Sequence, residues 1–211
     1  MEQMTAILYL CVAVPMLPVI IILPEKKSRL LILYFLLGMT VCFLTGSINA
    51  YLVEITDGSN TTLTTIVAPI TEELLKAVPV IYYALLFSDD RKELLSVAFM
   101  TGIGFAILEN IIILTQTLST VTVVWAAMRA AGATLMHGAC TAAVGLGISF
   151  IRKRKKLFYC GTFALLSAAI TFHAVFNVLV ISQFSILAFI LPSALYIFVI
   201  FILVSEIHFQ S

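Results

Sequence analysis

The sequence predicts an all-α, polytopic transmembrane bundle of about seven helices, with the N-terminus outside and the C-terminus cytoplasmic. The composition, the apolar segments and the placement of basic residues each indicate this class. Of the 211 residues, 62% are hydrophobic and only 11% are charged, and the mean hydropathy is +1.13. Soluble domains carry about 25% charged residues, so this chain lacks the polar surface that water requires. We expect a single transmembrane domain over residues 1–211.

Apolar segments long enough to cross a bilayer follow one another along the chain. A spanning helix needs about 20 apolar residues. Seven segments qualify, at 5–23, 30–53, 64–87, 94–117, 121–151, 157–181 and 184–204. The first lacks a basic region before it and a clear cleavage site after it, so we expect a retained helix rather than a signal peptide. The fifth is long for one span, which predicts a tilt, a kink or a projection into water.

Basic residues gather in alternate loops. Ten of the twelve Lys and Arg residues follow the first, third and fifth segments. They are Lys26, Lys27, Arg29, Arg91, Lys92, Arg152, Lys153, Arg154, Lys155 and Lys156. The positive-inside rule makes these loops cytoplasmic and favours an odd number of spans in the plasma membrane.

The cysteines give no sign of a cross-linked or zinc-ribbon fold. Cys11, Cys42, Cys140 and Cys160 are scattered through apolar stretches without CxxC spacing, and we expect small, buried apolar residues. The lipid bilayer is the expected surrounding, and no nucleic-acid partner is expected.

Ionisable residues also interrupt the apolar segments. They are Glu72, Glu73, Lys76, Glu109, Arg129, His137 and His173. A charged group at the bilayer centre costs about 2.5–3.5 kcal/mol on insertion scales. These side chains are therefore expected to face one another or a water-filled cavity.

Helical spacing predicts that these groups converge. Glu72 and Lys76 are four residues apart and share a helix face, as do His173 and Asn177. At 1.5 Å per residue, Glu72 lies about 12 Å from the outer end of its segment. Similar counts bring polar groups on four helices to one layer, at the midplane or slightly outward. Gly102, Gly104 and the small residues of 126–147 would allow close packing of these helices.

Two chemistries fit a carboxylate beside histidines. Glu72 could take a proton from water while His173 and Asn177 hold the oxyanion of a hydrolysed amide. Alternatively, Glu72, Glu109, His137 and His173 could bind zinc, which accepts these ligands. HExxH spacing is absent, so a metal would have to be gathered from four helices. We favour the site without a cofactor and keep zinc as the alternative.

Four short motifs resemble those of the PrsW-type intramembrane proteases. They are PITEELLK at 69–76, GIGFAILEN at 102–110, MHG at 136–138 and HAVFN at 173–177. Proteins of that family share an EExxK, an FxxxEN, an isolated helix histidine and an HxxxN element in this order. The resemblance covers the motif-bearing core at about 64–181.

The resemblance implies roles for individual residues. Glu72 would activate water, Glu73 and Lys76 would support it, and His173 with Asn177 would stabilise the oxyanion. Glu109 and His137 complete the catalytic set, while Phe105, Asn110 and Arg129 are assigned to substrate binding.

The family is distantly similar to CAAX prenyl proteases and bacteriocin-processing proteins. Lys76 stands one residue earlier than the arginine of their EExxxR motif, and Glu109 stands where they have histidine. The role of Glu109 is therefore left open, and so is any claim on prenylated substrates.

The predicted function is an intramembrane endopeptidase that cuts a membrane-tethered protein near the outer membrane boundary. The resemblance implies glutamic-type chemistry and site-1 cleavage of an anti-sigma factor. A proton- or ion-coupled transporter could use the same buried Glu and His groups. Such carriers often contain inverted repeats, and no second EExxK-like segment is found here. A non-catalytic chaperone fits less well because every motif position is filled.

Overall fold

The computed structural model describes residues 2–56, 59–117, 119–194 and 196–197, and this part of the chain is helical without strands. The elements are α1 (Glu2–Ile22), α2 (Lys26–Thr56), α3 (Asn60–Thr62), the π-helix η1 (Leu63–Val67), α4 (Ala68–Leu86), α5 (Arg91–Thr117), α6 (Val123–Ile148) and α7 (Lys155–Val180). A shorter apolar helix follows at Ser185–Ala194. The predicted all-α bundle is confirmed.

Within the described residues, five helices are long and apolar enough to span a membrane: α1, α2, α5, α6 and α7. The predicted third span, at 64–87, holds α4, whose 19 residues carry Glu72, Glu73 and Lys76. These three charges distinguish α4 from the five apolar helices. The predicted seventh span, at 184–204, is helical at Ser185–Ala194, but residues 195 and 198–204 lie outside the described residues. The long fifth segment ends as a helix at Ile148, before the basic loop.

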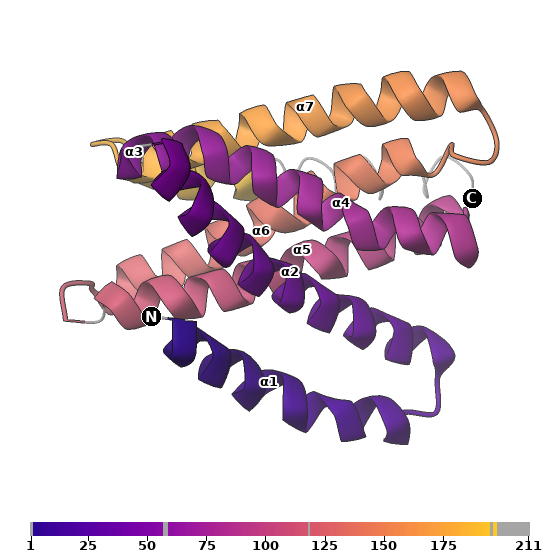
Figure 1. Ribbon diagram of the computed structural model, residues 1–211, viewed down its shortest axis with the longest axis horizontal. Coiled ribbons are helices and arrows are strands. Elements are labelled where there is room, and N and C mark those ends of the chain that lie inside the picture. The colour runs from indigo at the N-terminus through magenta and orange to yellow at the C-terminus, as the bar shows by residue number, and fades with distance from the viewer. Residues whose placement is uncertain (1, 57–58, 118, 195, 198–211) are drawn as a thin grey trace.

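The three basic loops lie at one end of the bundle (Figure 1). The loop after α6 contacts the end of α4 and the loop that follows it, because Arg152 donates to the Leu85 carbonyl and Lys153 Nζ donates to the Asp89 carbonyl at 2.7 Å. Asp90 caps α5 by accepting from the backbone N–H groups of Lys92 and Glu93. The bond from Glu93 lowers the pKa of Asp90. This end carries the charge that predicts a cytoplasmic face.

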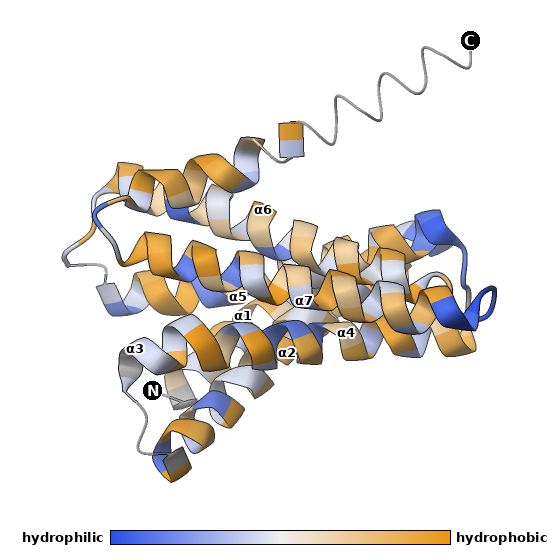
Figure 2. Cartoon of the chain, turned by 90° about the horizontal axis from the view of Figure 1, so that it is seen from above, coloured by the Kyte–Doolittle hydropathy of each residue, from blue (hydrophilic) through white to orange (hydrophobic). Residues whose placement is uncertain are grey.

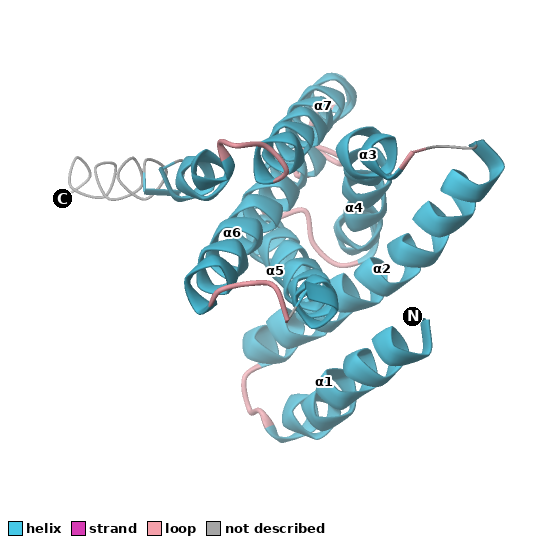
Figure 3. Ribbon diagram, turned by 90° about the vertical axis from the view of Figure 1, so that its left-hand side faces the viewer, coloured by secondary structure: helices cyan, strands magenta, loops and turns pink. Residues whose placement is uncertain are grey.

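Helix α2 crosses the bundle obliquely, and α1 lies outside it against α2 (Figure 3). Helix α5 packs between α2 and α6, and α7 packs against α6 and α4. The helical surfaces are largely hydrophobic, whereas the loop after α6 is hydrophilic (Figure 2). Such surfaces suit lipid contact, as does α1, of whose apolar window only 6% is buried.

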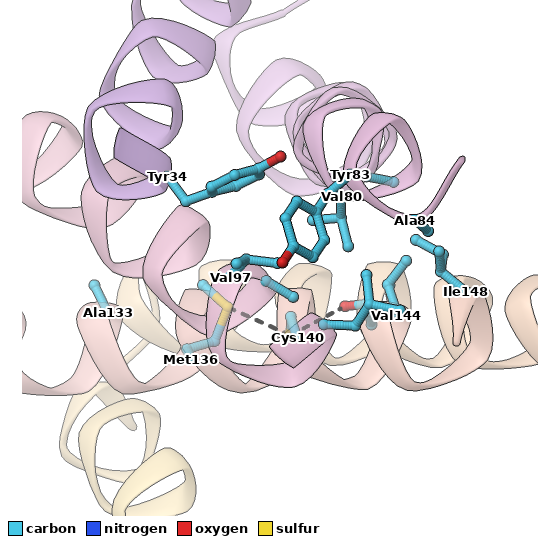
Figure 4. Close-up of a cluster of buried hydrophobic side chains, with 14 of the residues drawn as sticks. Tyr34, Val80, Tyr83, Ala84, Val97, Ala133, Met136, Cys140, Val144 and Ile148 are labelled. Carbon is cyan, nitrogen blue, oxygen red and sulfur yellow. Dashed lines mark hydrogen bonds between the residues drawn. The ribbon is translucent and has the colours of Figure 1, made fainter. Parts of the chain in front are cut away.

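A hydrophobic cluster joins α2, α4, α5 and α6 (Figure 4). Its buried members include Tyr34, Val80, Tyr83, Ala84, Val97, Met136, Cys140, Val144 and Ile148. The rings of Tyr34 and Tyr83 meet edge to face with centroids 5.5 Å apart. This packing fixes the turns of α4 that follow Lys76 and the turns of α6 on either side of His137.

The prediction that all four cysteines are buried is wrong for two of them. Cys42 and Cys140 are buried, whereas Cys11 and Cys160 are exposed. The pattern misleads because a lipid-facing position accepts the same apolar side chains as the core.

Glycines bring α5 into backbone contact with its neighbours. A Cβ at Gly38 or Gly104 would collide with the backbone of the facing helix, at Thr101 and Phe35 respectively. A Cβ at Gly102 would collide with the carbonyl of His137 on α6. The predicted role of Gly102 and Gly104 in close packing is confirmed, and Gly102 sets the distance between α5 and a site histidine.

We predict that Gly102→Ala lowers the thermal unfolding midpoint of the purified protein, because overpacking costs about 1–3 kcal/mol. Gly161→Ala is the matched control, since a Cβ at Gly161 on α7 meets nothing within 4 Å. It should leave the midpoint unchanged or raise it, because Ala favours the helix by about 0.5–1 kcal/mol. Equal midpoints for the two variants would contradict the close contact at Gly102.

Candidate active site

The ammonium group of Lys76 occupies the centre of the site. Lys76 lies on α4 with none of its surface exposed. Its Nζ donates to Glu73 Oε1 at 2.6 Å and to His137 Nδ1 at 2.8 Å. Removing a charge from water is costly unless it is paired and hydrogen-bonded, and both conditions are met here. Lys76 thereby joins α4 to α6.

The position of Lys76 decides the protonation of His137. An ammonium group only donates, so His137 Nδ1 must accept, and the ring proton resides on Nε2. Nε2 lies 3.2 Å from Glu109 Oε2 on α5 and donates to it. The ring of Phe105 lies against His137 with centroids 5.0 Å apart, and Lys76 Nζ stands 4.8 Å from the Phe105 centroid. Phe105 therefore packs against the charged network.

His173 on α7 faces both glutamates of α4. Its Nδ1 donates to Glu73 Oε1 at 2.9 Å, which leaves Nε2 with a free lone pair. Nε2 lies 3.6 Å from Glu72 Oε2, too far for a direct hydrogen bond. Both atoms are buried and have no hydrogen-bond partner among the described residues. Two such atoms facing each other mark a place for a shared water, proton or metal ion.

Glu109 links the centre to a second cation. Arg129 on α6 approaches Glu109 Oε2 at 3.6 Å and stands 6.0 Å from the ring of Trp125. The Glu109 side chain keeps 22% of its surface exposed, whereas those of Glu73 and Lys76 are fully buried. Asn110, the neighbour of Glu109, is buried and its Oδ1 has no partner among the described residues. The Glu109 side chain is therefore more accessible than the Glu73–Lys76 pair.

Asn177 contacts the π-helix rather than the central groups. Its Nδ2 donates to the Thr64 carbonyl at 2.8 Å. In an α-helix that carbonyl would meet the N–H of Ala68, but here Ala68 donates to Leu63 one residue earlier. The next residue, Pro69, has no N–H to offer. The wide turn before Pro69 thus turns a backbone carbonyl toward α7.

Most of these groups lie where the sequence predicted, but several of their contacts were not predicted. Residues of α4, α5, α6 and α7 do meet in one network, as the spacing predicted. The expected partner of Lys76 on the shared face was Glu72, but Glu73 forms the ion pair. A hydrogen bond from Thr71 Oγ1 to Asn49 Oδ1 at 2.6 Å, which ties α4 to α2, was also missed. A buried Asn in an apolar segment was the available signal for it.

A metal ion fits part of this arrangement. One ligand atom each from Glu72, His137 and His173 lie within 4.8 Å of one another. The 3.6 Å between Glu72 Oε2 and His173 Nε2 approaches the ~3.4 Å expected for two ligands about 2.0–2.1 Å from zinc. His137 does not fit as arranged, because both its nitrogens have partners and one partner is a cation. Glu109 is engaged by His137 and Arg129.

The sequence also matches a family model. The model is described as PrsW family intramembrane metalloprotease, and it matches residues 26–205. The chain belongs to the PrsW family. It is therefore an intramembrane protease and a multi-pass membrane protein, with a membrane-protein substrate and a lipid environment. Membership supports the protease interpretation over the transporter, and the metalloprotease description is compatible with a zinc ion.

No curated protein and no solved structure matches this PrsW-family chain. The roles of its residues therefore rest on the geometry of the site.

We predict that Lys76→Met lowers the thermal midpoint strongly, because losing one member of a buried pair costs about 3–5 kcal/mol. Adding Glu73→Gln removes the stranded charge, so the double variant should recover part of the loss. Lys92→Met is the control, since Lys92 is exposed, and it should leave the midpoint unchanged. A double variant no more stable than Lys76→Met alone would refute the pairing.

Proposed function

We propose that this PrsW-family protease hydrolyses a peptide bond of a membrane-tethered protein, with Glu72 as the base that activates water. The observation that carries the proposal is the pair of buried, unpartnered atoms Glu72 Oε2 and His173 Nε2, 3.6 Å apart. A water molecule that lies beside the two atoms and hydrogen-bonds to both would satisfy them.

The distribution of charge favours Glu72 over the other acids. Glu73 is neutralised by Lys76, and Glu109 faces Arg129 and His137. Among the described residues, no Lys or Arg lies within ion-pair distance of Glu72. A general base must exchange its proton during the reaction, which a carboxylate fixed in a buried ion pair resists. Glu73 and Lys76 are then supports, as the family resemblance implied.

The proposed reaction needs only groups of this chain and one water. Water oxygen attacks the scissile carbonyl carbon, its proton passes to Glu72, and the carbonyl oxygen becomes an oxyanion. Protonated Glu72 faces the free Nε2 of His173, so the proton can reach that nitrogen and make it a donor. Collapse of the oxyanion breaks the C–N bond, and the departing nitrogen takes up the proton. Asn177 could serve as a second oxyanion donor after releasing Thr64.

A bound zinc ion would offer an alternative way to activate the water. Glu72 and His173 would hold it, and His137 would join them only after giving up Lys76 or Glu109. Zinc would supply Lewis acidity and lower the pKa of the attacking water. Because His137 is engaged, we favour the glutamic-type mechanism.

The charge asymmetry supports an orientation for the substrate. If the basic loops face the cytoplasm of a plasma membrane, η1 and the start of α4 lie toward the outer boundary. Cleavage would then fall in the outer half of the membrane. A membrane-tethered regulator cut there first, such as an anti-sigma factor, is the substrate class that the family resemblance implies.

We predict that Glu72→Gln reduces cleavage at least about 100-fold, because general-base catalysis contributes roughly 10²–10⁴-fold. The assay uses purified protein in liposomes with a pool of single-span peptides that vary outside the membrane, read by mass spectrometry. Glu54→Gln, at an exposed acid of α2, is the control and should cut as the wild type does. Cleavage by Glu72→Gln at the wild-type rate would refute the mechanism.

We also predict that phenanthroline leaves cleavage of the same pool unchanged, because a glutamic-type site needs no metal. The measurement pairs the treated enzyme with metal analysis of the purified protein. Loss of cleavage that stoichiometric zinc restores would replace the glutamic-type mechanism with the metal-dependent one, in which Glu72 and His173 are ligands.

A further inference from the structure

A groove of about 380 Å³ runs along the outer surface of the seam between η1–α4 and α7. Thr65, Ile66 and Ile70 form one wall. Ile170, Thr171, Ala174, Val175, Val178 and Leu179 form the other. We propose that this groove, the α4–α7 groove, receives the membrane-spanning segment of the substrate protein, an inference that rests on the proposed protease function.

The groove follows the same seam as the catalytic groups. Ile70 precedes Glu72 by two residues on α4, and Ala174 follows His173 on α7. Ile70 and Val178 are exposed by 40% and 48%, whereas His173 is fully buried. The groove therefore lies on the lipid-facing side of the two helices, and Glu72 and His173 meet on their inner side. A chain lying in the groove is separated from the base only by the seam.

Two threonines place polar atoms on the walls of the groove. Thr65 Oγ1 donates to the Thr61 carbonyl and Thr171 Oγ1 donates to the Ser167 carbonyl, each at 2.8 Å. Each hydroxyl has used its one proton, so it presents acceptor lone pairs. Lipid tails have no donors for these lone pairs. A peptide segment that unwinds before cleavage has N–H groups that need acceptors within the membrane.

The π-helix η1 contributes one exchangeable hydrogen bond across the seam beside the groove. The hydrogen bond from Asn177 to the Thr64 carbonyl joins the two walls, and it depends on one side chain. Neither Ala68, which donates to Leu63, nor Pro69, which has no N–H, supplies the usual helical donor to that carbonyl. A substrate amide could take the place of Asn177 at this carbonyl. Exchange of one hydrogen bond for another would release this contact between η1 and α7 at little cost, while the bond from His173 to Glu73 still joins α7 to α4.

The test uses a photo-crosslinking residue in place of Ile66 or Val178, in the Glu72→Gln background so that peptide is retained. The probe is the same pool of single-span peptides in liposomes. Phe163 on α7 is the matched control position, because it is 73% exposed and lies outside the groove. We expect several-fold more peptide crosslinked from the groove positions than from position 163.

A second variant tests the groove by kinetics. Val178→Trp should fill the groove and raise KM about tenfold with kcat unchanged, a loss of ~1.4 kcal/mol of binding. Phe163→Trp should change neither constant.

The outcomes separate this inference from the proposed function. If the wild type cuts the pool but groove positions crosslink no more than position 163, or only to lipid, the groove inference is overturned and the protease mechanism stands. If the wild type cuts no member of the pool, the proposed function fails and the inference fails with it.

Discussion

The buried ammonium of Lys76 is the constraint on which the rest of the site depends. With no exposed surface, it must be neutralised within the protein, and Glu73 at 2.6 Å does so. Its second bond, to His137 Nδ1, fixes the proton of that ring on Nε2 and directs it to Glu109. Glu73 in turn fixes the proton of His173 on Nδ1. The Lys76–Glu73 ion pair thus sets the protonation of two histidines on two helices.

These hydrogen bonds form only where the helices lie close together. The glycines of α5 allow that close packing. Gly102 lies against the carbonyl of His137, the residue that Lys76 and Glu109 share. A side chain there would push α6 outward and lengthen both hydrogen bonds to the His137 ring. The small residues are therefore part of the electrostatics, because hydrogen bonds weaken steeply when their geometry is lost.

The helical period and the composition of the sequence predicted the helical bundle and the meeting of its charged groups. Charges in apolar segments had to meet, and helical spacing gave the layer at which Glu72, Glu109, His137 and His173 do so. The spacing favoured Glu72 as the partner of Lys76 and was wrong, because spacings of three and four residues both allow contact on a helix. The π-helix was also missed. It depends on Pro69 acting together with a tertiary partner, Asn177, more than a hundred positions away in the chain.

The same ion pair argues for which glutamate exchanges protons. If Glu73 took up a proton, Lys76 would be left as an unneutralised charge in the most buried part of the bundle. If Glu72 takes up a proton from water, its negative charge disappears while the oxyanion acquires one nearby, so the net charge of the site stays constant. A dry site favours the step that moves charge over a short distance without creating it. Glu73 is thus suited to hold His173 and Lys76 in place, and Glu72 to carry the proton.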